Sequence, residues 1–540
     1  MSGENSKTGM AGTAERIREF PRHYGPECAA GLSCLVFACL THAFRWFNTM
    51  YQHDALLVNQ RDFGYQIALG RFLYPLYVLT RGKIVSPPFV GLFGTVFLTA
   101  AAMLCVHTLK IRSRLAAAAA GALMAVTETV TILAATCLEC FDVQLLALLF
   151  ASASAFFLLR KGTRSFLLGA GFLTAQLALY QAYIEVTAAV VLLFLLRLLL
   201  ENERPAAAVR TGLRALGGIL AGGLFYGLCL RLLWKVFQSE TITASNGLTQ
   251  LGSITLRSAG GRLAHTYLSF VQYFLRSEIL HRQVSAALYI LLAVFLIASP
   301  AAAACRGRIR KGNALCCGLL VLLLPLALNA VAFLIMGEKH GLMRYAYVFF
   351  PVAALLFADA LFYGKDTRGT AGRTVREALL CICGILILCH MGYAGQVYTK
   401  KALECEAAKS FMTRIVMRME ETEGYVPGQT PVVILGDADE NPVVTERGGF
   451  RFTDEWLVRD HRMAVSYYQT YELYFANILG YRINLVDIRN VAPYLTLDEV
   501  RKMPVFPLPG SVRMVGDTLI VRLSEDIRPQ ELRPEMNIRY

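Results

Sequence analysis

The chain has 540 residues, of which 55% are apolar and only 17% are charged, and long apolar runs recur along most of it. Soluble domains carry about a quarter charged residues, so this composition excludes a soluble globular enzyme and predicts a polytopic membrane protein. The net charge of +14 does not indicate a nucleic-acid partner, because the basic residues lie in short loops between apolar runs and no compact basic domain stands out.

Residues 1–28 are polar and basic, and we expect them to form a cytoplasmic segment without a cleavable signal peptide. Residues 29–398 then form the transmembrane domain, because runs of about 20 apolar residues suit helical spans. We predict about eleven spans, and the division between the fifth and the sixth is the least distinct. The predicted spans lie near residues 29–48, 86–109, 115–136, 141–159, 165–183, 185–200, 212–234, 284–304, 314–336, 345–363 and 378–398.

The charges of the loops orient these spans. With a cytoplasmic N-terminus, every basic cluster falls on the cytoplasmic side, as the positive-inside rule requires. The clusters are at 110–114, 160–164, 204–214, 306–311 and 365–376. Acidic, aromatic and amide side chains gather in the opposite loops, at 49–85, 138–142, 180–185, 235–283 and 337–344. We therefore predict a multi-pass protein of a bacterial cytoplasmic membrane, with its C-terminal domain outside the cytoplasm.

The first outer loop carries the most informative charges. It brings Asp54, Arg61, Asp62 and Arg71 together just after a span, where charges are costly unless they sit in water or take part in chemistry. Helical spacing over 52–72 predicts an interfacial helix, and residues 262–281 show the same pattern. The alternative is an ordinary polar loop in which Asp54 caps a helix and the other charges are solvated.

Carboxylates beside arginines suit chemistry on lipid-linked anionic substrates. Asp54 is the candidate base for an attacking hydroxyl, and Asp62 either shares this role or pairs with Arg61. The guanidinium forks of Arg61, Arg71 and Arg344 match phosphate oxygens and are candidate phosphate ligands.

Two further outer turns carry candidate substrate ligands. Glu139 and Asp142 could bind a sugar hydroxyl or a metal ion, or could cap helix ends. Tyr180 and Gln181 are residue types that often contact sugars, although an aromatic residue at a membrane interface is also common, and Glu185 lies close to them in sequence.

Glu128 is the carboxylate placed deepest within a predicted span. Intramembrane acids are functional by default, which favours a transporter, whereas a neutral Glu hydrogen-bonded beside two threonines is the structural alternative. Cys137 and Cys140 form a Cys-x-x-Cys pair that no second Cys pair or His pair accompanies. No cofactor is therefore indicated, and the requirement for a divalent metal is left open.

Residues 399–540 have a different character. An amphipathic helix over 404–421, a β-branched strand over 431–437, a helix over 467–479 and a second strand over 515–522 predict a small extracytoplasmic α/β domain. The Gly436–Asp439 loop follows a strand without a Gly-rich phosphate motif, so a turn is favoured over a ligand loop.

Several of these features together resemble a known family. The acidic first outer loop, Gly70-Arg71-Phe72 followed by Pro75, the acidic second loop and Tyr180-Gln181 are similar to bacterial serotype-converting O-antigen glucosyltransferases over roughly residues 30–360. That resemblance implies a GT-C-like helical fold. It also implies inverting transfer of a glucosyl unit from a polyprenyl-phosphate donor to a lipid-linked or cell-surface glycan, with Asp54 at the first-loop acid position. The C-terminal domain matches no family that we can name.

Three functions are compatible with these patterns. A membrane glycosyltransferase accounts best for the outer-loop charges, because a phosphate leaving group needs positive charge and an acceptor hydroxyl needs a base. A transporter or flippase of lipid-linked sugars would place polar residues at the membrane midplane, where we find only Glu128. A non-catalytic scaffold with a glycan-binding outer domain is the third.

Overall fold

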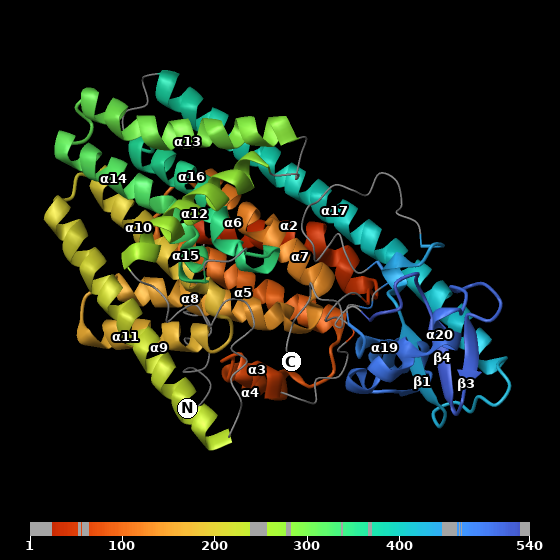
Figure 1. The fold of residues 1–540 in the computed structure, drawn as a ribbon. Helices are drawn as coiled ribbons and strands as arrows, with labels where there is room; N and C mark the ends of the chain where they lie inside the picture. The colour runs from red at the N-terminus through yellow and green to blue at the C-terminus, as the bar shows by residue number, and fades with distance from the viewer. Residues whose placement is uncertain are drawn as a thin grey trace, which may run out of the picture.

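The computed structural model describes residues 24–51, 56, 64–237, 256–276, 282–335, 339–364, 370–444, 462–463, 465 and 467–529. A bundle of apolar helices forms the larger part, and a small α/β domain lies at one side of it (Figure 1). The single long helix α17 (Thr370–Glu420) runs through the bundle and on into the smaller domain. It continues without a break past residue 399, where we place the domain boundary.

Within the described residues, ten helical stretches are long and apolar enough to cross a membrane. Several of these stretches begin with a short 3-10 turn or contain a break. The last of the ten stretches lies in α17. The helices in these stretches are α2 (Gly25–Phe47), α5 (Pro87–Thr108), α6 (Arg114–Val126) with α7 (Glu128–Thr136), α8 (Phe141–Leu158), α10 (Ile184–Leu200), α11 (Pro205–Phe237), α13 (Arg282–Cys305), α14 (Lys311–Leu328), α16 (Phe349–Phe362) and α17. The prediction of a polytopic α-helical membrane protein is confirmed.

The expected span over 165–183 is α9 (Thr163–Leu177), which has 15 residues and is shorter than a full crossing. It packs against both α8 and α11. The helix predicted over 262–281 is α12 (Leu256–Leu275). Of the helix predicted over 52–72, the described part contains α3 (Gly64–Ala68), and α4 (Leu73–Arg81) follows it.

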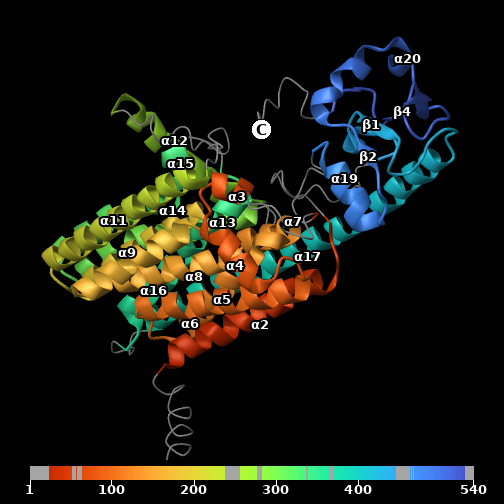
Figure 2. The ribbon, with the colours of Figure 1, turned by 90° about the horizontal axis from the view of Figure 1, so that it is seen from below.

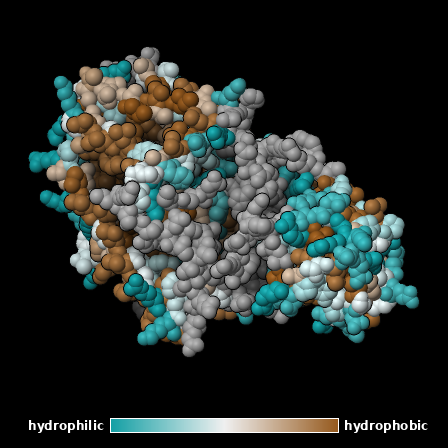
Figure 3. Space-filling model, in the orientation of Figure 1, coloured by the Kyte–Doolittle hydropathy of each residue, from teal (hydrophilic) through white to brown (hydrophobic). Residues whose placement is uncertain are grey.

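Large apolar side chains cover the outward faces of α11, α13 and α14. Leu224, Leu228, Ile297 and Leu315 are each more than 60% exposed. Figure 3 shows a broad hydrophobic area over this part of the bundle, whereas the α/β domain is largely hydrophilic. A continuous apolar surface of this kind is expected where helices face lipid.

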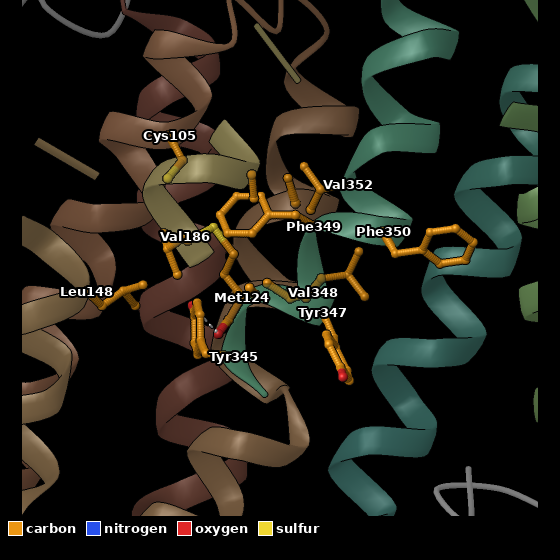
Figure 4. Close-up of a cluster of buried hydrophobic side chains, with 14 of the residues drawn as sticks. Cys105, Met124, Leu148, Val186, Tyr345, Tyr347, Val348, Phe349, Phe350 and Val352 are labelled. Atoms are coloured by element: carbon orange, nitrogen blue, oxygen red, sulfur yellow. Dashed lines mark hydrogen bonds between the residues drawn. The ribbon is translucent and has the colours of Figure 1, made fainter. Parts of the chain in front are cut away.

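The span predicted over 115–136 is broken in its middle. Thr127 adopts non-helical dihedral angles between α6 and α7, so Glu128 begins a new half-helix. The segment before α16 packs against this break. The Tyr345 hydroxyl donates to the Met124 carbonyl at 3.1 Å (Figure 4). The Thr129 hydroxyl donates to the Gly341 carbonyl at 2.8 Å. Irregular backbone at membrane depth is tolerated when protein surrounds it in this way.

The α/β domain contains a four-stranded sheet in the order β2-β1-β4-β3. Its strands are β1 (Pro431–Leu435), β2 (Asn484–Leu485), β3 (Val512–Val515) and β4 (Thr518–Arg522). Central strand β1 is parallel to β2 and β4, whereas β3 and β4 form an antiparallel hairpin. The domain also contains α19 (Thr470–Tyr474), which continues as a π-helix to Leu479, and α20 (Asp498–Arg501). Both predicted strands and the helix near 467–479 are therefore present.

The first loop of the bundle is attached to this α/β domain. Leu56 is 1% exposed and belongs to the hydrophobic core that the sheet forms with the C-terminal half of α17. Its carbonyl accepts a hydrogen bond from Asn477 Nδ2 at 3.0 Å, and the Tyr51 N–H donates to Cys405 Sγ at 3.2 Å. Figure 2 shows that α17 extends from the bundle into this domain. The two hydrogen bonds therefore join the first loop to residues more than 350 positions later in the chain.

Candidate functional site

Arg71 and Tyr180 form the centre of the candidate site. Arg71 lies just before α4, where its Nη1 donates to Gln66 Oε1 at 3.1 Å and its guanidinium lies 5.1 Å from the centre of the Tyr180 ring. Arg71 Nε and the Tyr180 hydroxyl are both buried, and neither has a hydrogen-bond partner among the described residues. Buried polar groups are almost always paired, so this arrangement is suited to a polar ligand.

The backbone that presents Arg71 is attached to two other elements. Gln181 Nε2 donates to the Leu69 carbonyl at 2.7 Å and to the Tyr226 hydroxyl at 3.0 Å. The Tyr226 hydroxyl donates in turn to the Gly70 carbonyl at 3.1 Å. The predicted ligand Gln181 thus lies beside Arg71 and Tyr180, but its amide is engaged in holding the Arg71 loop against α11.

Asp142 lies at the start of α8 and is satisfied within the protein. Arg81 Nη1 donates to Asp142 Oδ1 at 2.8 Å, and the Tyr77 hydroxyl donates to Oδ2 at 2.8 Å. The Val143 N–H adds a third hydrogen bond. Burial raises the pKa of Tyr77, and the neighbouring carboxylate raises it further. This arrangement favours a structural role for Asp142, in which it anchors α4 to the bundle.

Glu139 lies in the 3-10 turn η2 (Leu138–Cys140) and is 5% exposed. Its Oε1 accepts a hydrogen bond from Cys140 Sγ at 3.1 Å. Arg45 contributes positive charge nearby: it is fully buried, and its Nε donates to the Ala134 carbonyl at 2.8 Å. Glu139 therefore occupies a buried position beside an arginine that sequence reasoning did not include.

Arg344 and Glu128 both contact Tyr273. The Tyr273 hydroxyl donates to Glu128 Oε2 at 2.8 Å, and the Arg344 guanidinium lies 5.6 Å from the centre of the Tyr273 ring. Glu128 is half-buried at the break between α6 and α7. The structure therefore brings the intramembrane acid and the distant predicted phosphate ligand into one cluster, through a tyrosine on α12.

A buried ion pair lies close to that cluster. Lys339 Nζ is 2.6 Å from Glu185 Oε2, and Glu185 Oε1 accepts a hydrogen bond from the Val331 N–H at 2.7 Å. Lys339 also lies 4.7 Å from the centre of the Tyr347 ring. Burial lowers the pKa of Lys339, although Glu185 opposes this shift. The pair fixes the segment that carries Arg344 against the start of α10.

Three sequence-predicted site residues, Asp54, Arg61 and Asp62, lie outside the described residues. Sequence reasoning did not select Arg81, Tyr226, Tyr273 or Lys339. Arg81 could have been noticed, because it follows Tyr77 by one helical turn in the same polar loop. Nothing in the local pattern identifies Tyr226 or Tyr273, since each hydroxyl donates to a group more than 100 residues away in the chain.

In the part of the chain that the structure describes, no group of three or more His, Cys, Asp or Glu side chains could hold a metal ion. No curated protein and no solved structure matches the chain. The family model described as "Glucosyl transferase GtrII" matches residues 44–357, which is more than half of the chain and spans every candidate residue from Asp54 to Arg344. The resemblance to serotype-converting glucosyltransferases is confirmed. The chain therefore belongs to the GtrII glucosyl transferase family and is a multi-pass membrane glucosyltransferase.

Proposed function

We propose that this glucosyltransferase uses a polyprenyl-phosphate-linked glucose as donor. On this proposal it transfers the glucosyl unit, with inversion, to a lipid-linked or cell-surface glycan at the outer face of a bacterial cytoplasmic membrane. The observation that carries the proposal is the pair formed by Arg71 Nε and the Tyr180 hydroxyl, two buried groups without hydrogen-bond partners among the described residues.

A phosphate is the ligand that this pair suits best. An arginine that is partly buried interacts strongly with a phosphate oxygen, because little water competes for the charge. Arg71 already has one nitrogen held by Gln66, which fixes the direction of the guanidinium before a ligand binds. A tyrosine hydroxyl beside it can donate to a second phosphate oxygen.

Asp54 is the proposed base, and Asp62 is a second acid in the same loop. The acceptor hydroxyl would lose its proton to Asp54 as its oxygen attacks the anomeric carbon. The bond from that carbon to the phosphate oxygen breaks at the same time, and the polyprenyl phosphate leaves with the bonding electrons. Arg71 stabilises the charge that develops on the leaving phosphate. Arg61 and Arg344 are further candidate phosphate ligands.

The outer location is supported by the distribution of charge at the two ends of the bundle. At the end opposite Arg71, Asp359 pairs with Arg197 at 2.7 Å and accepts hydrogen bonds from the backbone of Arg112 and Ser113. The basic loops lie at that end, which is where the positive-inside rule expects them. The Arg71 end, and the α/β domain beyond it, would then face outward.

A radiolabel transfer assay tests the proposal. Purified protein in nanodiscs is given polyprenyl-phosphate [14C]glucose and a lipid-linked glycan, and labelled glycan is counted. Wild-type protein should transfer label, and Asp54→Asn should lose transfer while keeping its monodisperse elution profile. Full transfer by Asp54→Asn would contradict the assignment of the base, and absence of transfer by the wild type from any polyprenyl-phosphate glucose would overturn the donor class.

A flippase of lipid-linked sugars is the second candidate, because Glu128 sits at a helix break within a span, as transporter sites often do. Its test is movement of a fluorescent polyprenyl-phosphate sugar across proteoliposomes that lack an acceptor. Movement that depends on Glu128 and proceeds without transfer would favour this alternative.

A further inference from the structure

The α/β domain and the adjoining part of α17 enclose a cavity of about 230 Å³. One wall is the C-terminal half of α17, which contributes Glu404, Ser410, Phe411 and Arg414. The other wall contains Arg462 and Met463, which follow β1 in the chain. We call this cavity the α17 pocket. It involves none of the residues assigned above to donor binding or catalysis.

The segment that follows β1 holds one wall of the pocket in place. From β1 the chain passes to β2 on one side and then returns to β4 on the other side, so the crossing directions diverge at β1. A crevice at the carboxyl end of such a strand is the usual ligand position in open α/β sheets. Asp439 follows β1 and accepts hydrogen bonds from the backbone N–H groups of Arg462 and Met463, at 3.1 and 2.7 Å. These bonds hold Arg462 at the edge of the pocket.

The charges of the pocket favour an anion. Glu404, its acidic lining residue, lies 3.0 Å from Lys400 and 3.2 Å from Lys401, so its charge is already balanced. Arg414 forms no ion pair with any carboxylate in the described ranges. It lies 5.7 Å from the centre of the Phe411 ring and 6.0 Å from that of Phe506. Arg462 shares its charge with Asp439 and lies within electrostatic reach of Lys400. Arg414 and Arg462 therefore both line a pocket whose lining carboxylate, Glu404, is already paired with two lysines.

The remaining lining suits a sugar ring. Phe411 and Met463 supply apolar surface, and Ser410 and Glu404 supply groups that can hydrogen-bond to hydroxyls. The volume is below the roughly 300–1,000 Å³ that sites for drug-sized ligands occupy, so a single charged ring fits better than a longer oligosaccharide. We infer that the α17 pocket binds one anionic sugar residue, with its phosphate or carboxylate between Arg414 and Arg462. This residue would belong to the acceptor glycan, which is the part of the inference that rests on the proposed function.

Binding is measured first, without reference to transfer. Full-length protein in detergent carries the Arg71→Ala change, which removes the proposed donor site, and is dialysed to equilibrium against radiolabelled glucose 6-phosphate, glucose or inorganic phosphate at low salt. We expect glucose 6-phosphate to bind at least tenfold more tightly than either of the other two probes. Equal binding of inorganic phosphate would overturn the assignment of a sugar, and no binding of any probe would overturn the site.

Variants then locate the binding. Arg414→Ala combined with Arg462→Ala should weaken binding of glucose 6-phosphate at least tenfold. Arg418→Ala is the matched control, because this arginine lies one turn further along α17, is 44% exposed and does not line the pocket. Unchanged binding in the double variant, with an unfolding temperature like that of the wild type, would overturn the inference.

A transfer assay tests whether the bound sugar residue belongs to the acceptor glycan. The double variant should raise the KM for an anionic acceptor glycan about tenfold and leave the KM for the donor unchanged. An unchanged acceptor KM in a double variant that has lost the binding would overturn the link to the acceptor. If the wild type transfers no glucose, the proposed function fails, while the binding result still decides the pocket.

Discussion

Arg81 and Asp142 form a buried ion pair that joins the first loop to the membrane helices. Their nearest atoms are 2.8 Å apart, and their side chains are 2% and 0% exposed. Arg81 is the last residue of α4 and Asp142 is the second residue of α8, so the pair fixes the short helix that follows Arg71. The position of the proposed phosphate ligand therefore depends on an interaction about three helical turns away from it along the chain.

Removal of one member of this pair should be costly. Arg81→Ala leaves the Asp142 charge buried with less compensation, and breaking such a pair typically costs 3–5 kcal/mol. We expect a lower unfolding temperature in detergent and a smaller yield of monodisperse protein. Arg81→Met combined with Asp142→Leu should recover much of the loss, because no isolated charge remains. An Arg81→Ala protein as stable as the wild type would contradict the structural role of the pair.

Arg71→Ala should lower the rate of transfer by about 10²-fold, in the range seen when one donor to a developing anion is removed. Arg71→Lys should recover only part of this rate, because an ammonium group does not reproduce the planar fork of a guanidinium. The measurement is the initial rate of [14C]glucose transfer over a range of donor concentrations. Arg164→Ala, an exposed change on α9, is the control and should retain the wild-type rate.

Gly70→Ala should disturb the Arg71 loop through a close contact as well as through backbone strain. Gly70 has φ +83°, and an added Cβ would overlap the Tyr226 hydroxyl and lie 3.1 Å from Gln181 Nε2. Gly82→Ala is the matched control, because Gly82 has φ +103° but its Cβ would meet open space. Transfer should fall further in Gly70→Ala than in Gly82→Ala, and Tyr226→Phe should partly rescue it. Equal losses in the two variants would indicate strain alone.

Leu56→Ala should destabilise the α/β domain even though Leu56 belongs to the first loop. Loss of a buried leucine side chain costs about 2–5 kcal/mol. Because Leu56 lies two residues after the proposed base Asp54, we also expect transfer to fall at temperatures where the protein remains folded. Unfolding is followed by calorimetry and transfer by the radiolabel assay. Leu508→Ala, at a position that is 57% exposed, should change neither.

The α/β domain should lose stability as the pH rises from about 4 to 6. Burial, reinforced by Asp437, raises the pKa of Asp439 from 3.8 to about 6. The folded state therefore binds a proton more tightly than the unfolded state, and this contribution to stability disappears as the pH passes the folded pKa. Over the whole titration the free energy of unfolding falls by about 3 kcal/mol, and about 2 kcal/mol of this falls between pH 4 and 6.

Calorimetry of the full-length protein at pH 4.5 and 7 compares the wild type with Asp439→Asn, which should be less sensitive to pH. Asp487→Asn is the control, because Arg489 lowers the pKa of exposed Asp487 to about 2, outside this interval. An Asp439→Asn protein with the same pH dependence as the wild type would contradict the prediction.

Local patterns predicted most of the architecture. Apolar runs of about 20 residues predict spans because each must satisfy its own backbone in lipid, and most of the predicted spans are helices here. The β-branched run after Pro431 and the run around Leu519 both predict strands, and both are strands. The break at Thr127 was not predicted, because its neighbours in α6 and α7 are as apolar as those of an unbroken span.

The candidate site was only partly visible in the sequence. Residue types and loop polarity selected Arg71, Tyr180, Gln181 and Arg344. Whether each side chain is available to a ligand depends on partners that are distant in the chain. Gln181 is engaged by a carbonyl 112 residues earlier, and Asp142 by an arginine 61 residues earlier. A hydrogen bond forms only when the folded chain brings donor and acceptor within about 3 Å, so periodicity and composition predicted the helices, whereas the tertiary structure decided which of their polar groups remain free for chemistry.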